Sequence, residues 1–267
     1  MGVALAHSKN DVAEMNRRTF LAMIIAASAL PSIAAEKDTR CFEMRTYFAA
    51  PGKLDALHKR FREHTCALFE KHGMTNLGYW TPLENPESKL VYVLACPSRD
   101  AREKSWKKFM ADPHWQSAWK ASEVEGKLVA KVESTFLSAT DFSPEIKPST
   151  AAPRIFELRT YTTTPGNLPR LLSRFREHTT ALFAKHGMTN LFYWTPMPDQ
   201  KDAESTLVYL LAHKDAAAAK ASFEAFRADP VWIDVKAASE KAAGGSLTVP
   251  DGVRSVFMQA TDYSATK

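Results

Sequence analysis

An internal duplication constrains the fold of this chain more strongly than any other feature. Residues 42–82 and 156–196 align without a gap at an offset of 114, and 29 of the 41 positions are identical. The match continues more loosely as far as residues 139–142 and 260–263. A repeat of this length is one structural unit built twice, so a fold that fits one copy has to fit the other.

Each copy shows the same succession of strand and helix patterns. Short alternating or apolar runs predict strands, and apolar residues at helical spacing predict helices. Gly73 suits a helix C-cap because it can take a positive φ, and Asp112-Pro113 is typical of a helix start. In the first copy the predicted strands are 42–48, 76–81, 89–95 and 134–140, and the predicted helices are 54–72 and 99–111.

The order βαββαβ is the ferredoxin-like split unit. Its sheet carries helices on one face, and the bare face must be covered. Two copies in one chain can cover each other. The sequence therefore predicts an α+β protein in which two tandem ferredoxin-like units pack as a dimeric α/β-barrel-like pseudo-dimer. Such a monomer is self-sufficient, and further dimerisation of whole chains stays open.

The N-terminus has the pattern of an export signal. Residues 16–30, NRRTFLAMIIAASAL, combine paired arginines with an apolar stretch, and small residues follow up to Ala35. The stretch is shorter than the roughly 20 residues that span a bilayer, and the pattern resembles a twin-arginine signal peptide. We therefore expect residues 1–35 to be removed from a periplasmic or otherwise extracytoplasmic protein that touches the membrane only through this signal. An uncleaved anchor is the alternative, and the true start is Met1 or Met15.

Charge and cysteine content exclude several classes of protein. The net charge is +5, but lysine and arginine alternate with carboxylates, as in residues 100–104, so no nucleic-acid partner is expected. No metal site is expected, because the three cysteines lack Cys-x-x-Cys spacing. The chain also lacks a Gly-rich phosphate loop, a Ser-His-Asp order and a paired His-Glu zinc motif.

Several segments together resemble the NIPSNAP family. The strings FEMRTY, PGKL, FREHT and KHG of the first copy return as FELRTY, PGNL, FREHT and KHG, and each copy has an Ala-Asp-Pro-x-Trp segment. The resemblance implies two NIPSNAP-like domains of the dimeric α/β-barrel superfamily at residues 40–143 and 154–264. The Pro-, Ser- and Thr-rich residues 144–153 form a linker between them. The family has no agreed reaction, and the mitochondrial and vesicle roles of its members do not transfer to an exported protein.

The first strand of each copy supplies candidate ligand-binding residues. Apolar residues on the strand alternate with Glu43, Arg45 and Tyr47, so we expect the apolar side to meet the helices and the polar side to face the barrel interior. There an arginine would offer a forked donor and a tyrosine a hydroxyl to an anionic or carbonyl-bearing molecule. A Glu–Arg pair that satisfies only itself is the alternative. The second copy repeats the triad as Glu157, Arg159 and Tyr161.

His64 and His178 are the candidate catalytic residues. At α-helical spacing His64 falls on the apolar face of the helix 54–72, and His178 falls likewise in the second copy. Such a histidine is a hydrogen-bonded core residue, a general base or a haem ligand, and one per copy is too few for a metal cage. His72 and His186, in the last helical turn, are interpreted as structural.

Residues at strand ends supply two further predictions. Trp80 and Trp194 end the second strands, where each either lids a ligand pocket or plugs the barrel. Cys41 begins the first strand and Cys96 ends the third. These strands are antiparallel neighbours in a βαββαβ sheet, so the two cysteines are a candidate disulfide in an oxidising compartment.

The leading functional hypothesis is that the barrel interior binds a small molecule. Whether the protein is an enzyme stays open. One alternative is a cofactor-independent oxygenase or isomerase, as among wider relatives on this fold, with His64 or His178 as base. No cofactor is expected. Haem is the alternative, because haem enzymes also occur on the fold. The other alternative is a non-catalytic protein-interaction scaffold, and fold alone does not choose among these.

Overall fold

The computed structural model describes residues 1–2, 38–150 and 154–267. Residues 38–150 and 154–267 form one compact unit that contains both copies. The predicted export signal lies outside the described residues, apart from its first two, and stays a prediction. Within the described part, no helix combines the length and the apolar character needed to cross a membrane.

Both copies fold in the predicted order. The first consists of β1 (Cys41–Ala49), α1 (Leu54–Arg60), the π-helix η1 (Phe61–Thr65), α2 (Cys66–Lys71), β2 (Thr75–Pro82), β3 (Lys89–Cys96), α3 (Arg99–Ala111), α4 (Pro113–Ser122) and β4 (Val129–Ala139). The second consists of β5 (Ile155–Thr163), α5 (Leu168–Arg174), the π-helix η2 (Phe175–Thr179), α6 (Thr180–Lys185), β6 (Thr189–Pro196), β7 (Thr206–His213), α7 (Ala216–Ala228), α8 (Pro230–Ala243) and β8 (Thr248–Ala260). The βαββαβ prediction is confirmed in both, with the helix break at Asp112-Pro113 and a π-helical turn that the sequence pattern did not predict.

The eight strands close into one barrel in the order β1-β3-β2-β8-β5-β7-β6-β4. Each copy contributes four adjacent strands, and the antiparallel pairs β2–β8 and β4–β6 join the copies. Two separate four-stranded sheets would expose their edge strands, and closure pairs them. The predicted pseudo-dimeric α/β barrel is thereby confirmed.

The barrel interior is an apolar core that both copies build. Trp80 packs on Phe156 with ring centroids 5.7 Å apart, and Trp194 packs on Phe42 at 6.0 Å. These four side chains are at most 1 % exposed. The two tryptophans therefore act as plugs of the barrel rather than as lids. The same core includes Leu77, Val91, Val93, Leu137, Phe192, Leu210, Met258 and Ile146, the last from the predicted linker.

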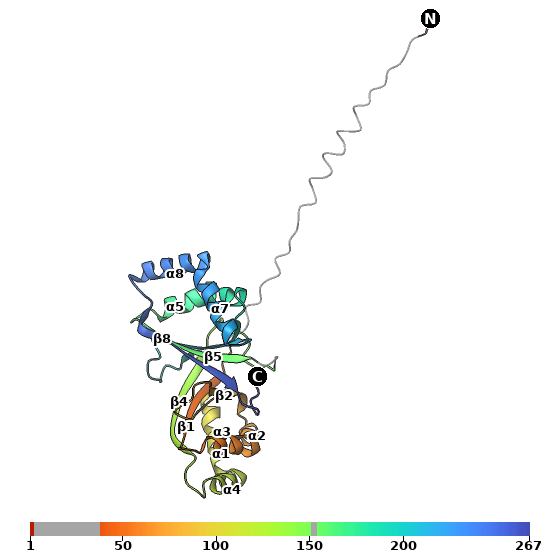
Figure 1. Cartoon of the computed structure of the whole chain (residues 1–267), viewed down its shortest axis with the longest axis vertical. Coiled ribbons are helices and arrows are strands. Elements are labelled where there is room, and N and C mark those ends of the chain that lie inside the picture. Colours follow the sequence, from red (N-terminus) through yellow and green to blue (C-terminus); the bar gives the residue numbers. More distant parts are fainter. Residues whose placement is uncertain (3–37, 151–153) are drawn as a thin grey trace. The chain divides into compact units, whose positions relative to one another are not determined.

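The helices cover the outside of the barrel, with those of the first copy on one side of the strands and those of the second on the other (Figure 1). Each helical layer encloses its own aromatic core against the outer face of its sheet. In the first copy this core includes Phe61, Phe69, Tyr79, Tyr92 and Phe109. In the second it includes Phe175, Phe183, Tyr193, Tyr209 and Phe226. The molecule thus has three cores, one inside the barrel and one under each set of helices.

An aspartate N-cap ties the helices of each copy together. Asp112 accepts hydrogen bonds from Lys71 Nζ and His72 Nε2, both at 2.7 Å, and from the backbone N–H of His114 at the start of α4. His72 is therefore structural, as interpreted. The hydrogen bonds from Lys71 and His72 hold the pKa of Asp112 well below its usual range. Asp229 repeats the arrangement with Lys185, His186 and the backbone of Val231.

We expect the stabilising effect of Asp229 to disappear in acid. Its folded-state pKa is depressed, so its contribution is present above the unfolded value of about 3.9 and is lost as the pH falls below it. Asp229→Asn keeps an N-cap acceptor but removes the charge. The variant should have a lower urea midpoint than the parent at pH 7, and the two midpoints should converge as the pH falls below about 4. A constant difference across this range would show that the charge contributes nothing.

Candidate functional site

Glu43 is the centre of a buried ion cluster between β1 and α3. Arg102 donates to both of its carboxylate oxygens, from Nε and Nη2, each at 2.7 Å. Arg45 forms a second ion pair with it, and Ser134 donates at 2.6 Å. Burial alone would raise the pKa of Glu43, but the bond from Arg102 and the charge of Arg45 outweigh burial and hold the pKa below its ordinary value. Glu43 is therefore an anion held entirely by the protein.

The prediction that the triads face the barrel interior is wrong. Glu43 reaches Arg102 on α3, and the guanidinium of Arg45 lies 4.5 Å from the ring of Trp106 on the same helix. The opposite side of the strand, with Phe42 and Met44, belongs to the interior core. The physical reason is that closing two sheets on each other requires a dry apolar face on both, whereas the charges find their partners on the covering helix.

The second copy satisfies its carboxylate with a different nitrogen partner. Glu157 pairs with Arg159 and accepts from Ser255 Oγ at 2.5 Å. Its third partner is His213 Nε2 on β7, at 3.0 Å. Burial again opposes ionisation, but His213, Arg159 and Ser255 together lower the pKa of Glu157.

The exchange of nitrogen partners follows from two coupled differences between the copies. At an offset of 117, Arg102 corresponds to Ala219, and Cys96 corresponds to His213. The guanidinium lost from the helix is replaced by an imidazole on the neighbouring strand. Both copies thus keep a buried carboxylate with two nitrogen partners, which supports the self-satisfied interpretation of the Glu–Arg pair.

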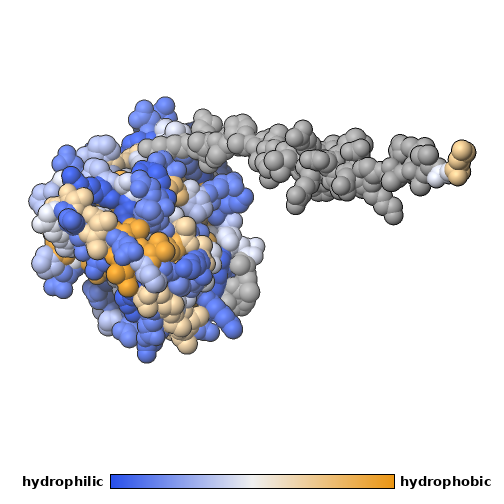
Figure 2. All heavy atoms as spheres, turned by 90° about the horizontal axis from the view of Figure 1, so that it is seen from above, coloured by the Kyte–Doolittle hydropathy of each residue, from blue (hydrophilic) through white to orange (hydrophobic). Residues whose placement is uncertain are grey.

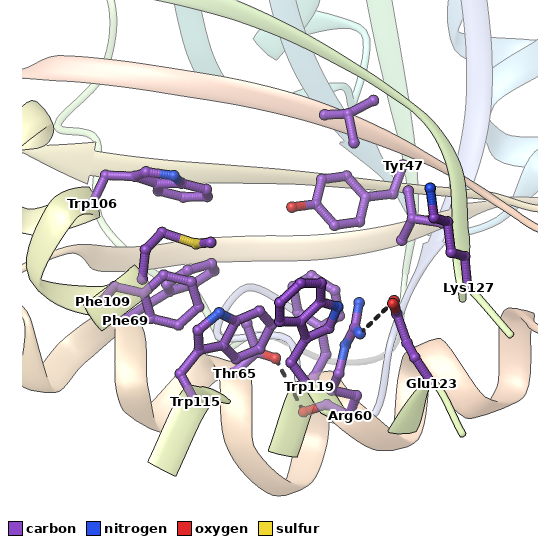
Figure 3. A pocket seen from close by; sticks show the side chains of 14 residues that line it. Tyr47, Arg60, Thr65, Phe69, Trp106, Phe109, Trp115, Trp119, Glu123 and Lys127 are labelled. Atoms are coloured by element: carbon purple, nitrogen blue, oxygen red, sulfur yellow. Dashed lines mark hydrogen bonds and ion pairs between the residues drawn. The ribbon is translucent and has the colours of Figure 1, made fainter. Parts of the chain in front are cut away.

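A pocket of about 340 Å³ lies between the first-copy helices and the strands β1 and β4 (Figure 3). Trp106 on α3 and Trp115 and Trp119 on α4 supply its aromatic wall, and Tyr47 on β1 is the member of the first triad that reaches it. Trp119 is 42 % exposed, so it stands at the mouth. The remaining lining residues are Arg60, Phe61, Thr65, Phe69, Phe109, Met110, Glu123, Lys127, Val129 and Val132.

Arg60 brings a charge into this aromatic pocket. It is 5 % exposed, donates to Glu123 at 3.1 Å and Ser122 at 3.2 Å, and lies over the ring of Trp115 at 5.4 Å. Its Nε and the indole Nε1 of Trp115 are buried and have no hydrogen-bond partner in the described part of the chain. A buried donor without a partner is costly. Both atoms are closed to solvent in this structure, so a bound molecule supplies the missing acceptor only after a small side-chain shift.

The π-helix η1 explains why His64 does not lie on the apolar face of the helix, contrary to the prediction from the sequence pattern. A π-turn inserts one extra residue into the helix, and Thr65 Oγ1 donates to the carbonyl of Arg60 across the turn at 3.1 Å. The buried positions therefore continue at Thr65, and His64 turns outward with its side chain 48 % exposed. The prediction of an apolar-face histidine is wrong. His178, on η2, is likewise turned outward.

A second pocket of about 340 Å³ occupies the equivalent place in the second copy. Arg159 and Tyr161 of the second triad reach it, together with Arg174, the counterpart of Arg60. The positions of Met110 and Trp119 are taken by Arg227 and Lys236. The other lining residues are Phe175, Thr179, Phe183, Phe223, Phe226, Trp232, Glu240, Ser246, Thr248 and Val253. The duplicated scaffold thus holds two pockets of equal size and different chemistry.

Cys41 and Cys96 lie opposite each other in the register of β1 and β3 and are free thiols in the structure. Directly opposed residues of antiparallel strands have Cα atoms about 4.5–5.5 Å apart, within the range of a disulfide. Burial raises the pKa of Cys96 to about 12 and also raises that of Cys41, so both thiols react slowly while the protein is folded.

The bridge stays a prediction, and thiol counting in denaturant checks it. Protein kept under oxidising conditions should show one thiol, Cys66, and three after reduction. Three thiols before reduction would rule the bridge out.

A hollow that the sequence pattern did not predict lies at the seam between the copies. It has a volume of about 500 Å³ and is lined by His58, Arg62 and Asp262 among others. Arg62 binds Asp262 through two hydrogen bonds of 2.6 and 2.7 Å, and His58 Nδ1 lies 2.7 Å from the hydroxyl of Tyr263. At the opposite seam Leu172 and Phe142 take the places of His58 and Tyr263. Comparing the two copies residue by residue would have pointed to this paired exchange.

Metal ligation receives no support from the described ranges. Within residues 38–150 and 154–267, no three His, Cys, Asp or Glu side chains are grouped as a metal would need.

Comparison with known proteins agrees with this architecture. The NIPSNAP family model matches residues 42–144 and 156–262. A NIPSNAP family protein of unknown function from Agrobacterium tumefaciens is 25 % identical and covers 40 % of this chain and 94 % of its own, with a TM-score of 0.36. None of the curated proteins matches.

More distant solved structures share the whole barrel. A putative monooxygenase from Fusobacterium nucleatum is 11 % identical over 83 % of this chain and 92 % of its own, with a TM-score of 0.54. A putative chlorite dismutase is 11 % identical over 84 % and 96 %, with a TM-score of 0.50. At such identity they show the fold alone. The two family matches and the duplicated barrel establish that this chain is a tandem-domain member of the NIPSNAP family.

Proposed function

We propose that this protein binds a small, uncharged aromatic molecule in the pocket of its first copy. The observation that carries the proposal is the gathering of Trp106, Trp115, Trp119 and Tyr47 around one open hollow. Aromatic rings offer large apolar area and prefer stacked or edge-to-face partners. Pockets of this size and apolar lining, with a few convergent polar groups, are typical of small-molecule sites.

The polar groups of the pocket indicate what else the molecule carries. Arg60 Nε and Trp115 Nε1 are donors without partners in the described residues, and the charge of Arg60 is already balanced by Glu123 at 3.1 Å. The remaining cation, Lys127, is exposed to solvent, so a neutral acceptor suits the site better than a second anion. The expected ligand is a flat aromatic ring system with a carbonyl or hydroxyl oxygen.

This placement replaces the hypothesis of a ligand in the barrel interior. The interior is occupied by Trp80, Trp194 and the apolar side chains packed on them. The helix-side pocket instead has an exposed residue, Trp119, at its mouth.

The alternative of an oxygenase or isomerase is not favoured by the candidate bases. The side chains of His64 and His178 are 48 % and 42 % exposed and each lies about 4 Å from a neighbouring glutamate. A haem site needs an axial ligand inside an apolar cavity, and these two histidines on the outer surface do not fit that requirement. The similarity to a putative monooxygenase supports the fold only.

Calorimetric titration of the intact protein with 2-naphthamide tests the proposal. The probe is flat and neutral and carries a carbonyl acceptor. Trp119→Ala should weaken binding about tenfold or more, because removing a stacked aromatic anchor costs more than about 1 kcal/mol. Lys236→Ala, at the equivalent position of the second copy, should leave that affinity unchanged. Equal affinity of the parent and Trp119→Ala would refute the proposal.

A further inference from the structure

We propose that the pocket of the second copy is a separate binding site that selects an aromatic carboxylate over its neutral counterpart. This inference concerns a different site from the first-copy pocket and a different class of ligand. It starts from a position-by-position comparison of two pockets that share one backbone scaffold.

Arg174 is a buried guanidinium with no carboxylate within ion-pair distance among the described residues. It is 7 % exposed and donates to Ser239 at 3.2 Å, as Arg60 does to Ser122. Arg60 is also paired with Glu123, but Arg174 makes no ion pair within the described residues, although Glu240 stands at the equivalent position. Its Nε has no hydrogen-bond partner there either. A buried charge of this kind needs an anion.

Two further cations stand at the same pocket. Arg227 on α7 and Lys236 on α8 replace Met110 and Trp119 of the first copy, and both line the second pocket. The carboxylate among the pocket residues is Glu240, so three cations face one anion when Arg159 is set against its own partner, Glu157. The first pocket has Arg60 balanced by Glu123, with Lys127 in addition.

The rest of the second pocket remains aromatic. Phe223, Phe226 and Trp232 line it, and the guanidinium of Arg174 lies 5.1 Å from the centroid of Trp232. Thr248 replaces Val129 on the strand side and adds a hydroxyl. An aromatic body between these rings, with a carboxylate directed to the cations, satisfies both the apolar and the charged parts of the lining.

Calorimetric titration of the intact protein with 2-naphthoate and 2-naphthamide tests the inference. The two probes share the ring system and differ in charge. At low salt the second-copy site should bind 2-naphthoate about tenfold or more tightly than 2-naphthamide, as expected for charge-assisted hydrogen bonds. The preference should shrink at high salt. The comparison is made in the Trp119→Ala background, where the first-copy site is weakened. Equal affinities for the two probes in that background would overturn the inference.

Variants that exchange residues between the copies locate the site. Arg227→Met with Lys236→Trp gives the second pocket the residues of the first at two surface positions. It should reduce the preference for 2-naphthoate to less than about threefold, because two of the three cations are lost and Arg174 remains with Glu240 as the carboxylate of the pocket. An unchanged preference in this variant would also overturn the inference. The reverse exchange, Met110→Arg with Trp119→Lys, should leave the 2-naphthoate site intact while weakening the first-copy site for 2-naphthamide.

Two outcomes separate this inference from the proposed function. If 2-naphthamide does not respond to Trp119→Ala, the first-copy proposal fails while the anion site still stands. If 2-naphthoate has no advantage, the anion site fails while the first-copy proposal still stands. The face seen from the side of α8 also shows an apolar patch among hydrophilic side chains (Figure 2). Ile233→Ser, at an exposed position of α8, controls for adsorption to exposed apolar side chains and should not change the affinity for either probe.

Discussion

Replacement of Glu43 by glutamine is expected to lower the free energy of unfolding by about 3–5 kcal/mol, the usual cost of removing one partner of a buried ion pair. The carboxylate is 1 % exposed and is the shared partner of Arg45 and Arg102. Without it two guanidinium groups stay buried beside each other, and the remaining carboxylate partner is the exposed Glu103, 3.4 Å from Arg102. Urea denaturation at neutral pH measures the loss, because glutamine preserves the size of the side chain and changes only the charge.

Two matched variants make the result interpretable. Glu157→Gln removes the equivalent carboxylate of the second copy, which pairs with one arginine, Arg159, where Glu43 pairs with two. The loss should therefore be smaller than for Glu43→Gln. Glu133→Gln breaks the exposed pair with Lys131 and should cost less than about 1 kcal/mol. Equal losses in all three variants would show that the buried clusters stabilise the fold no more than the exposed pair does.

Trp80→Ala should destabilise the protein by about 3–5 kcal/mol, the range for truncating a large aromatic core residue. Trp80 fills the barrel interior against Phe156 of the other copy, so the truncation removes packing within one copy and between the two. Chemical denaturation measures the loss in the free energy of unfolding, and both copies should unfold in one shared transition. A loss below about 1 kcal/mol would mean that the interior is not the packed core that the structure shows.

Trp119→Ala is the control for this second prediction. Trp119 stands at a pocket mouth rather than in a core, so its truncation should affect ligand affinity and leave stability within about 1 kcal/mol of the parent. Gly78 adds a local constraint, because a Cβ at this position would lie 2.4 Å from the Trp80 ring. The second copy has Phe192 there, packed on Trp194 at 5.2 Å.

The order and type of the elements could be predicted because their signals are local. Alternation on β1, the Gly73 cap and the Asp112-Pro113 helix start each depend on a few neighbouring residues. The duplication then supplied the one non-local step, since two identical half-bare sheets can close on each other. These signals led to the pseudo-dimeric barrel without any knowledge of side-chain contacts.

Which face of the first strand points into the barrel could not be predicted, because it depends on a distant partner. Glu43 and Arg45 form a polar stripe that could equally line a wet interior or meet a charged helix. The choice is made by Arg102, which lies 59 residues further on, on α3. In the second copy it is made by His213 instead. Only the comparison of the copies, in which an arginine is lost at one position and a histidine is gained at another, indicates this arrangement.

The predicted position of His64 is wrong for a different reason. Helical spacing assumes 3.6 residues per turn, and the widened turn at Phe61–Thr65 breaks that assumption by one residue. The motif FREHT occurs in both copies, and both form the π-helix. The shift moves Thr65 to the sheet side and His64 to the surface. The pockets could not be predicted from the sequence, because Trp115 and Trp119 come together with Tyr47 only when α4 packs over the sheet.

Fluorine NMR of protein labelled with 5-fluorotryptophan tests the central claim, that ligands enter the helix-side pocket and not the barrel. Each resonance is assigned by a single Trp→Phe variant, and 2-naphthamide is then titrated into the labelled protein. The resonances of Trp106, Trp115 and Trp119 should shift in proportion to occupancy, while those of Trp80 and Trp194, enclosed in the interior core, should stay in place. Shifts confined to Trp80 and Trp194 would place the ligand inside the barrel and contradict the account.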